Sequence, residues 1–472
     1  MNKIKNQLPI FFIFITILYS CSSSTHKTSN KNTDQNTVTY KQFDSTLSKG
    51  KLIEKVVCRD DTTQSYALYL PSFYSSEKKW PVIYFFDPHA DGSLPVNKYK
   101  ALAQKYAYII IGSNNSKNGL PMETLNRIAD ILINDAQQRL SIDENRVFTG
   151  GFSGGSRVAS SVAIYKGGIA GVIGCAAGFP NINGPLQHTF HYIGIAGNED
   201  FNLNEMKELD KALDGSGLRH DLIIYNGKHQ WAPEEIMLQA FTWLEVNSMK
   251  DKTEAVKDTF INNMVVTYED QIKELEQEEK VNEACIAYNH LIKYFEGMKD
   301  VSGYKKAVEG IERSDKMKEI IRTRKEIEDL ESKKQKEYMY NVSSKNIDWW
   351  KKEVTYLNKP MKNKQEETSM NKRLLGFLSL TMYMYSDAAL KENKYVEAEH
   401  FLTLYRLVDP MNVDAFYLSA CLSAKQKDSM HAITYLGQAI KMGFTDKKKL
   451  QEDTSFDFIK ETQEYKKLSS LY

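Results

Sequence analysis

Hydrophobic and polar positions follow two different patterns along this chain, and the change comes near residue 250. Before it, short apolar runs typical of strands buried on both faces are separated by segments with apolar residues at helical spacing. This alternation predicts a mostly parallel, doubly wound α/β sheet with helices on both faces. We expect strands at 51–58, 65–70, 80–86, 108–112, 146–149, 169–175, 191–196 and 222–225, and helices at 96–106, 124–140, 204–213 and 233–246, with a further helix of small residues after 153.

Beyond residue 250 the strand pattern disappears and a series of helices rich in Lys and Glu follows. A 34-residue period relates Ala398 to Ala432 and is similar to tetratricopeptide repeats, whose small residues let paired helices pack closely. A third unit is expected around Ala284, Tyr288 and Leu291. The expected domains are therefore an α/β domain over 41–250 and an all-α domain over 251–472. The other matching pairs are Ser386 with Ala420, Leu402 with Leu436, Tyr405 with Ala439, and Pro410 with Phe444.

Two stretches of the helical region have special composition. Residues 316–337 are so charged that a solvated helix is expected. Residues 341–368 are expected to be irregular or to form a hinge, with Trp349 and Trp350 as packing anchors.

The N-terminus has the composition of an export signal. Lys3 and Lys5 precede an apolar run at 8–18, which suits a secretory signal peptide better than a membrane span. The run ends at Cys21 in a segment that resembles the lipobox of bacterial lipoproteins, so residues 1–21 are expected to be a signal peptide and Cys21 the lipidated residue. An ordinary signal peptide with a nearby cysteine is the alternative. Residues 22–40 are polar and predict a flexible tether, which places the protein in the bacterial cell envelope, anchored to the membrane by lipid and facing the periplasm or the exterior.

Charge and cysteine content exclude some classes of site. The 472 residues carry a formal net charge of +1, which gives no electrostatic reason to expect a nucleic-acid partner. Four further cysteines are widely scattered and show no C-x-x-C spacing, so neither a metal site nor a disulfide framework is expected. Buried free thiols are predicted for Cys58, Cys175, Cys285 and Cys421.

The segment 151–155 (GFSGG) lies between a predicted strand and a predicted helix. A serine in G-x-S-x-G at such a turn forms a nucleophile elbow, whose sharp turn requires small neighbours. Ser153 is then the candidate nucleophile, and the Gly154 amide at the helix N-terminus is a candidate oxyanion donor. A simple tight strand-to-helix connection is the alternative.

A serine nucleophile needs a base and a carboxylate, which in this topology follow it in the order acid, then base. Asp200 follows the strand that ends at residue 196, and His229 follows the strand that ends at residue 225. Their rivals are Glu199, next to Asp200, and His220, which precedes its strand and should lie at the opposite edge of the sheet.

The loop after the third strand normally supplies a second oxyanion donor. Pro88 has no N–H, so the His89 amide is the candidate, although Asp87 and the His89 side chain have an equally good structural interpretation. Residues expected to line the substrate cavity are Asn114, Asn115, Phe201 and Trp231.

Segments 151–155 (GFSGG), 197–200 (GNED) and 227–231 (GKHQW) resemble the α/β-hydrolase superfamily. Residues 70–74 (LPSFY) and 80–85 (WPVIYF) are similar to polyhydroxybutyrate depolymerases, feruloyl esterases and prolyl-oligopeptidase-like peptidases. The resemblance implies a serine hydrolase without metal or cofactor that cleaves carboxylic esters, small or polymer-derived, through an acyl-enzyme. The alternatives are a peptidase, or an inactive scaffold whose helical repeats bind a protein partner.

Overall fold

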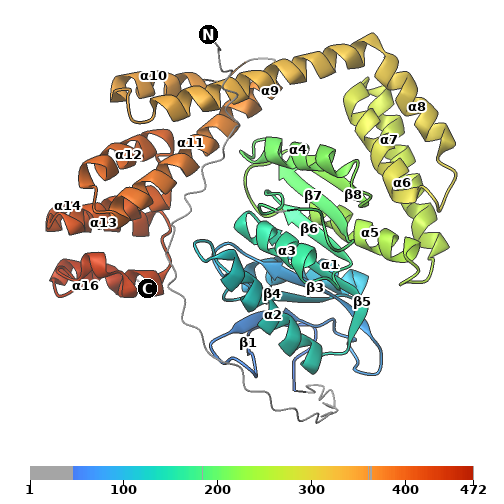
Figure 1. Cartoon of the computed structure of the whole chain (residues 1–472), viewed down its shortest axis with the longest axis horizontal. Helices are drawn as coiled ribbons and strands as arrows, with labels where there is room; N and C mark the ends of the chain where they lie inside the picture. The colour runs from blue at the N-terminus through green and yellow to red at the C-terminus, as the bar shows by residue number, and fades with distance from the viewer. Residues whose placement is uncertain (1–45, 183, 360, 362–363, 471–472) are drawn as a thin grey trace, which may run out of the picture. The chain divides into compact units, whose positions relative to one another are not determined.

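The computed structural model describes residues 46–182, 184–359, 361 and 364–470 (Figure 1). The expected signal peptide, tether and lipidated Cys21 lie outside the described residues. The described residues belong to one compact unit, which contains both the sheet and the helical region. Among the helices described, none combines the length and the apolar character that crossing a membrane requires.

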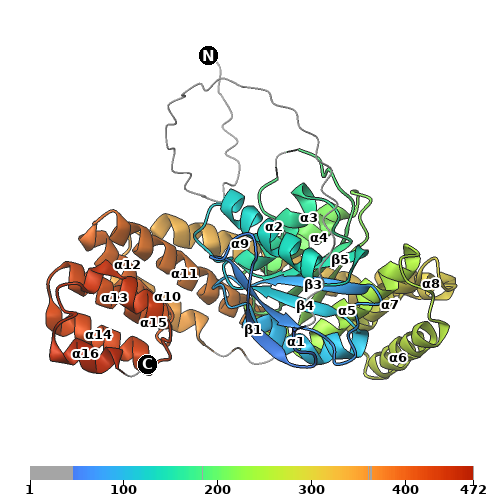
Figure 2. The same ribbon diagram turned by 90° about the horizontal axis from the view of Figure 1, so that it is seen from below.

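Eight strands form a single sheet in the order β1-β2-β4-β3-β5-β6-β7-β8. Figure 2 shows β1, β4, β3 and β5 of this sheet. β1, β2 and β4 pair antiparallel, and every pairing from β4 through β3 to β8 is parallel. The expected mostly parallel α/β fold is therefore confirmed. The strands are β1 (Leu52–Val57), β2 (Ser65–Tyr69), β3 (Trp80–Phe86), β4 (Ile109–Ser113), β5 (Ile142–Phe152), β6 (Gly171–Cys175), β7 (His191–Gly197) and β8 (His220–Tyr225).

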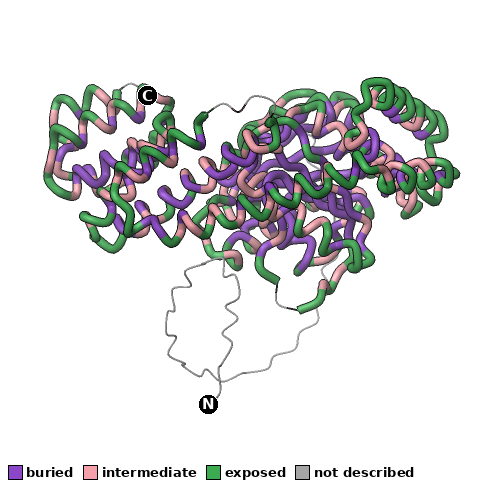
Figure 3. Tube along the Cα trace, turned by 90° about the horizontal axis from the view of Figure 1, so that it is seen from above, coloured by how far each residue is buried: buried purple, intermediate pink, exposed green. Residues whose placement is uncertain are grey.

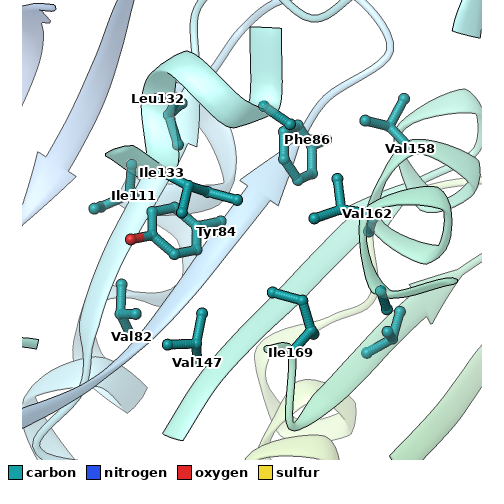
Figure 4. Packing of buried hydrophobic residues seen from close by; sticks show 14 of the residues in the cluster. Val82, Tyr84, Phe86, Ile111, Leu132, Ile133, Val147, Val158, Val162 and Ile169 are labelled. Atoms are coloured by element: carbon teal, nitrogen blue, oxygen red, sulfur yellow. The ribbon is translucent and has the colours of Figure 1, made fainter. Parts of the chain in front are cut away.

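Successive residues of a strand point to opposite faces of the sheet. Apolar side chains lie on both faces here, and helices cover both. Val82, Tyr84 and Phe86 of β3 pack in the core that also includes α2, α3 and α4 (Figure 4), whereas Ile83 and Phe85 pack in the core of α1 and α5. All seven residues of β3 are buried, which explains its continuous apolar sequence. The helices are α1 (Ser93–Tyr106), α2 (Met122–Arg139), α3 (Gly154–Tyr165), α4 (Leu203–Leu213) and α5 (Glu234–Lys250).

The first helices after residue 250 continue the core of the α/β domain. Tyr268 of α6 (Asp258–Gln277) and Leu291 of α7 (Val281–Phe295) belong to the same apolar core as α5. The change in secondary structure near residue 250 therefore does not coincide with a boundary between cores. Two more helices follow, α8 (Ser302–Arg313) and α9 (Asp315–Asn341).

The remaining helices have an apolar core of their own, to which α9 contributes Ile327 and Tyr338. Ala398, Leu402, Ala432 and Leu436, which the 34-residue period selected, are all fully buried there. Figure 3 shows buried residues along one side of these helices and exposed residues along the other. The helices are α10 (Ile347–Leu357), α11 (Gln365–Lys391), α12 (Tyr395–Val408), α13 (Val413–Lys425), α14 (Ser429–Lys441), α15 (Lys447–Glu452) and α16 (Gln463–Ser469).

One expectation for this region was wrong. The stretch 341–368 contains the regular helix α10, because Trp350 is fully buried there and Trp349 packs edge-on against it at a ring distance of 4.9 Å. The charged stretch 316–337 lies within the helix α9 and most of its residues reach the surface, as expected, but Glu331 is 0% exposed. The four cysteines beyond residue 46 are buried free thiols, as predicted.

Candidate active site

Ser153 lies at a strained turn between β5 and α3, with φ 53° and ψ −121°. The Ser153 amide donates to the Cys175 carbonyl at 2.9 Å, which ties the turn to the next strand. A Cβ on Gly151 would lie 2.1 Å from the Gly155 carbonyl oxygen, and one on Gly155 would lie 1.9 Å from the Phe86 carbonyl oxygen. Both positions therefore require glycine, and the chain has the geometry of a nucleophile elbow.

Ser153, Asp200 and His229 lie together at the carboxyl ends of β5, β7 and β8. His229 Nε2 is 3.0 Å from Ser153 Oγ, and His229 Nδ1 is 2.9 Å from Asp200 Oδ1. A proton on Nδ1 suits the carboxylate beside it and leaves Nε2 able to accept the serine proton. Asp200 is fully buried, whereas the imidazole is 20% exposed and can meet a substrate.

The acid loop, residues 197–201, is tied to the loop that carries His229. The Asn198 amide donates to the Tyr225 carbonyl at 2.8 Å, and the Glu199 amide donates to the Gly227 carbonyl at 2.9 Å. The Asp200 carboxylate has fewer hydrogen bonds than the backbone of its loop. Its Oδ1 accepts from the Asn202 amide at 2.9 Å, but its buried Oδ2 has no donor among the residues that the structure describes.

Two aromatic rings fix the plane of the His229 imidazole. Phe201 stacks on it with a centroid distance of 4.1 Å, and Phe152 contacts it at 4.8 Å. Phe201 was predicted to touch substrate; in the structure it lies in the site, in contact with the His229 imidazole.

The rival acid and base have other partners. Glu199 forms an ion pair with Lys372 at 2.6 Å. His220 is the first residue of β8, and its Nδ1 bonds Asp210 at 2.7 Å, at the opposite edge of the sheet from Ser153. Neither of them takes part in the hydrogen bonds that join Ser153 to Asp200.

One of the two predicted oxyanion donors has a suitable position. Gly154 is the first residue of α3, where helix N–H groups lack intrahelical acceptors and favour negative charge. The His89 amide, in contrast, donates to Asp87 Oδ1 at 2.8 Å. That prediction does not fit the structure, because the His89 N–H already has an acceptor.

Asp87 and Trp231 form a structural pair below the site. Asp87 Oδ2 accepts from Trp231 Nε1 at 2.8 Å. Burial raises the pKa of Asp87, but hydrogen bonds from His89 and Trp231 outweigh it and lower the pKa below its usual value. Trp231 is 7% exposed and packs edge-on against Phe85. Trp231 therefore lies in the core, and the predicted contact with substrate does not fit this position.

Asn114 and Asn115 also have structural roles that the sequence did not indicate. Asn114 Nδ2 donates to the Glu54 carbonyl at 3.0 Å. Asn115 Oδ1 accepts from the Ser65 amide at 2.8 Å, and its Nδ2 donates to the Thr63 carbonyl at 3.1 Å. Both amide groups therefore fasten the β1–β2 edge, and the structure does not bring them to Ser153.

Asn118, in the same polar loop, reaches the site instead. A Cβ on Gly154 would lie 1.8 Å from Asn118 Oδ1, so the carboxamide rests directly against Gly154. The backbone N–H of Asn118 donates to the Pro88 carbonyl at 2.8 Å. This bond holds the polar loop next to the segment that follows β3. Asn118 could not be singled out from the sequence, because the run of polar residues after β4 does not reveal which side chain turns toward the elbow.

Neither a protein-family model nor a curated protein sequence matches the chain. Among solved structures, the chain is similar to S-formylglutathione hydrolase FrmB from Staphylococcus aureus, with 13% identity, 42% of this chain and 98% of that chain covered, and a TM-score of 0.34. A ferulic acid esterase has 15% identity, 42% and 97% coverage and a TM-score of 0.33. The feruloyl esterase module of Clostridium thermocellum has 13% identity, 43% and 89% coverage and a TM-score of 0.34. We infer the activity of this chain from its own residues.

Proposed function

We propose that the chain is a serine hydrolase that cleaves carboxylic esters through an acyl-enzyme. The observation that supports this most directly is the position of His229, within hydrogen-bond distance of Ser153 Oγ on one side and Asp200 on the other. Ser153 is the nucleophile, His229 the general base and then acid, and Asp200 the group that orients the imidazole.

The reaction follows from this arrangement. Ser153 Oγ attacks the ester carbonyl carbon while its proton passes to His229 Nε2. The intermediate collapses, the bond to the leaving oxygen breaks, and His229 returns the proton to that oxygen. Water then attacks the acyl group in the same way, with His229 taking its proton and giving one back to Ser153 Oγ.

The negative charge that develops on the carbonyl oxygen needs two hydrogen-bond donors. We assign the first to the Gly154 amide and the second to the Asn118 carboxamide, which rests against Gly154. A half-turn of the carboxamide presents Nδ2 in place of Oδ1, so the side chain can donate to that oxygen. A side-chain donor suits this site because the His89 amide is bonded to Asp87.

A fluorophosphonate probe tests the proposal, because it phosphonylates only an activated serine. We expect the wild type to be labelled and Ser153→Ala to be unlabelled, with turnover of aryl acetates reduced by about 10³-fold or more in that variant. Ser76→Ala, at an exposed serine, is the control and should label normally. A folded wild type that is not labelled would contradict the proposal and favour the inactive scaffold. Faster hydrolysis of aminoacyl amides than of aryl esters would favour a peptidase.

We also propose that lipid on Cys21 anchors the protein in the cell envelope, on the sequence pattern alone. Metabolic labelling with a radioactive fatty acid should mark the wild type and not Cys21→Ser. Equal labelling of both would contradict this anchor.

A further inference from the structure

Helix α11 contacts the acid loop through a buried arginine. Arg373 Nη1 donates to the Asn198 carbonyl at 2.7 Å, two residues before Asp200. The rest of the guanidinium binds Glu331 of α9, with Nη2 2.6 Å from Oε2 and Nε 3.0 Å from Oε1. Arg373 is 5% exposed and Glu331 is 0% exposed. α9, which lies beside α11 (Figure 1), therefore orients the arginine that holds the loop.

Two more residues of the same part of α11 contact the acid loop. Lys372 Nζ binds Glu199 Oε1 at 2.6 Å. Gly376, one turn further on, faces Phe201, because a Cβ there would lie 3.0 Å from Phe201 Cδ1. Phe201 in turn stacks on the His229 imidazole at 4.1 Å. α11 therefore contacts Phe201, which contacts the His229 imidazole. It also binds the backbone of the loop that carries Asp200.

The contacting part of α11 lies outside the repeat unit. With Ala398 at position 20, the repeat begins 19 residues earlier, at residue 379, whereas α11 begins at Gln365. Helix pairing in the repeats does not account for this extension. A buried ion pair contributes little net stability compared with an apolar pair of similar shape, so stability alone does not explain Arg373 and Glu331 either.

We propose that Arg373, oriented by Glu331, is a positioning residue for the Asp200–His229 pair, and that the N-terminal half of α11 completes the hydrolase site. This inference rests on the proposed function. Within the part of the chain that the structure describes, Asp200 has a hydrogen-bond donor outside the imidazole on one oxygen only, so the direction of its carboxylate depends on where the loop backbone lies. Without Arg373 the loop loses a charge-assisted hydrogen bond, and the carboxylate no longer holds the imidazole toward Ser153.

The test uses full-length protein and p-nitrophenyl acetate. The double variant Arg373→Met with Glu331→Leu removes the pair without leaving a buried charge, which favours folding. Arg373→Lys keeps a donor but loses the two-pronged contact with Glu331. Lys207→Met is the matched control, because the Lys207 side chain of α4 also pairs with α9, through Glu328 at 2.7 Å, and has no hydrogen bond or ion pair to the acid loop among the described residues.

We expect the double variant to lose about tenfold to a hundredfold in kcat, with KM within about threefold of wild type. Arg373→Lys should recover part of the loss, and Lys207→Met should keep wild-type kcat. Proton NMR supplies a signature that a purely structural role would not change: the deshielded proton between His229 Nδ1 and Asp200 should weaken in the double variant and persist in the control.

A folded double variant with wild-type kcat would overturn the inference, and so would an equal loss in Lys207→Met. If the double variant does not fold, Gly376→Leu decides, because leucine is favoured in a helix and forces Phe201 to move. Wild-type kcat in Gly376→Leu would then overturn the inference. Failure of the proposed function is distinct, since the wild type itself would show neither probe labelling nor turnover.

Discussion

The nucleophile elbow and the acid loop are held in place by different means. At the elbow, backbone meets backbone: the Ser153 amide binds the Cys175 carbonyl, and Gly155 lies so close to the Phe86 carbonyl that no side chain fits. The acid loop also has backbone bonds, to the His229 loop, but α11 adds side-chain contacts through Arg373 and Lys372. The contacts at the elbow position Ser153, the proposed nucleophile, from within the α/β domain, whereas Asp200, the proposed acid, also depends on α11 of the helical region.

This difference separates local from distant requirements on the sequence. The glycines that permit the elbow are within two residues of Ser153. Arg373 and Asn198, in contrast, are 175 positions apart. Substitutions in the two places should therefore affect stability and turnover differently, and four of them test that expectation.

The largest effect is expected at the acid itself. Asp200→Asn keeps the shape of the side chain but presents an amide to His229 Nδ1, which favours the wrong tautomer and should lower kcat by about 10⁴-fold. Glu199→Gln is the matched control one residue away and should change kcat only a few-fold. Steady-state kinetics on aryl acetates measure both. Equal losses in the two variants would show that Asp200 has no special role.

At the elbow the expected effect is on folding. A Cβ at Gly155 would lie 1.9 Å from the Phe86 carbonyl oxygen, and its nearest atoms all belong to the backbone of Phe86 and Asp87. Gly155→Ala should therefore lower the free energy of unfolding by about 4 kcal/mol or more. Gly310→Ala in α8 is the control: nothing lies within 4 Å there, and the added methyl should stabilise the helix by about 1 kcal/mol. Urea denaturation followed by circular dichroism measures both. A Gly155→Ala variant as stable as wild type would contradict the close packing at the elbow.

The same distinction explains what could be predicted from the sequence. The strand and helix pattern predicted the fold class. The turns after three predicted strands, β5, β7 and β8, pointed to Ser153, Asp200 and His229, and the structure brings these residues together. The supporting residues were not predictable. Asn114 and Asn118 have the same chemistry in the same loop, and only the pairing of that loop with its neighbours decides which one reaches the elbow.

The charge pattern of α9 correctly predicted a helix that lies mostly at the surface, but it did not indicate that Glu331 is buried. Glu331 is buried where it binds Arg373 of α11. Partners that come from distant helices leave no periodic signal in the sequence of either helix.

A smaller effect is expected on the oxyanion side of the elbow. Asn118→Ala removes the proposed side-chain donor and should lower kcat by about 10²- to 10³-fold with little change in KM. Asn115→Ala is the control from the same loop. Because Asn115 bonds the β2 edge, its loss should lower stability and leave kcat nearly unchanged. If the two variants lose kcat equally, Asn118 has no direct part in catalysis.

The smallest effect is expected from the exposed contact of the acid loop. Lys372 is 47% exposed where it pairs with Glu199, and ion pairs in contact with water contribute at most about 1 kcal/mol. Lys372→Met should therefore lower kcat by no more than about fivefold, and added salt should reduce the difference from wild type because it screens this pair. The buried Arg373 pair should be far less sensitive to salt. Turnover of Lys372→Met and of the double variant Arg373→Met with Glu331→Leu, measured from low to high ionic strength, would show whether the buried contact or the exposed one positions Asp200. A loss in Lys372→Met as large as that in the Arg373 variant would mean that the charge at the loop surface, and not the hydrogen bond to the Asn198 carbonyl, fixes the acid.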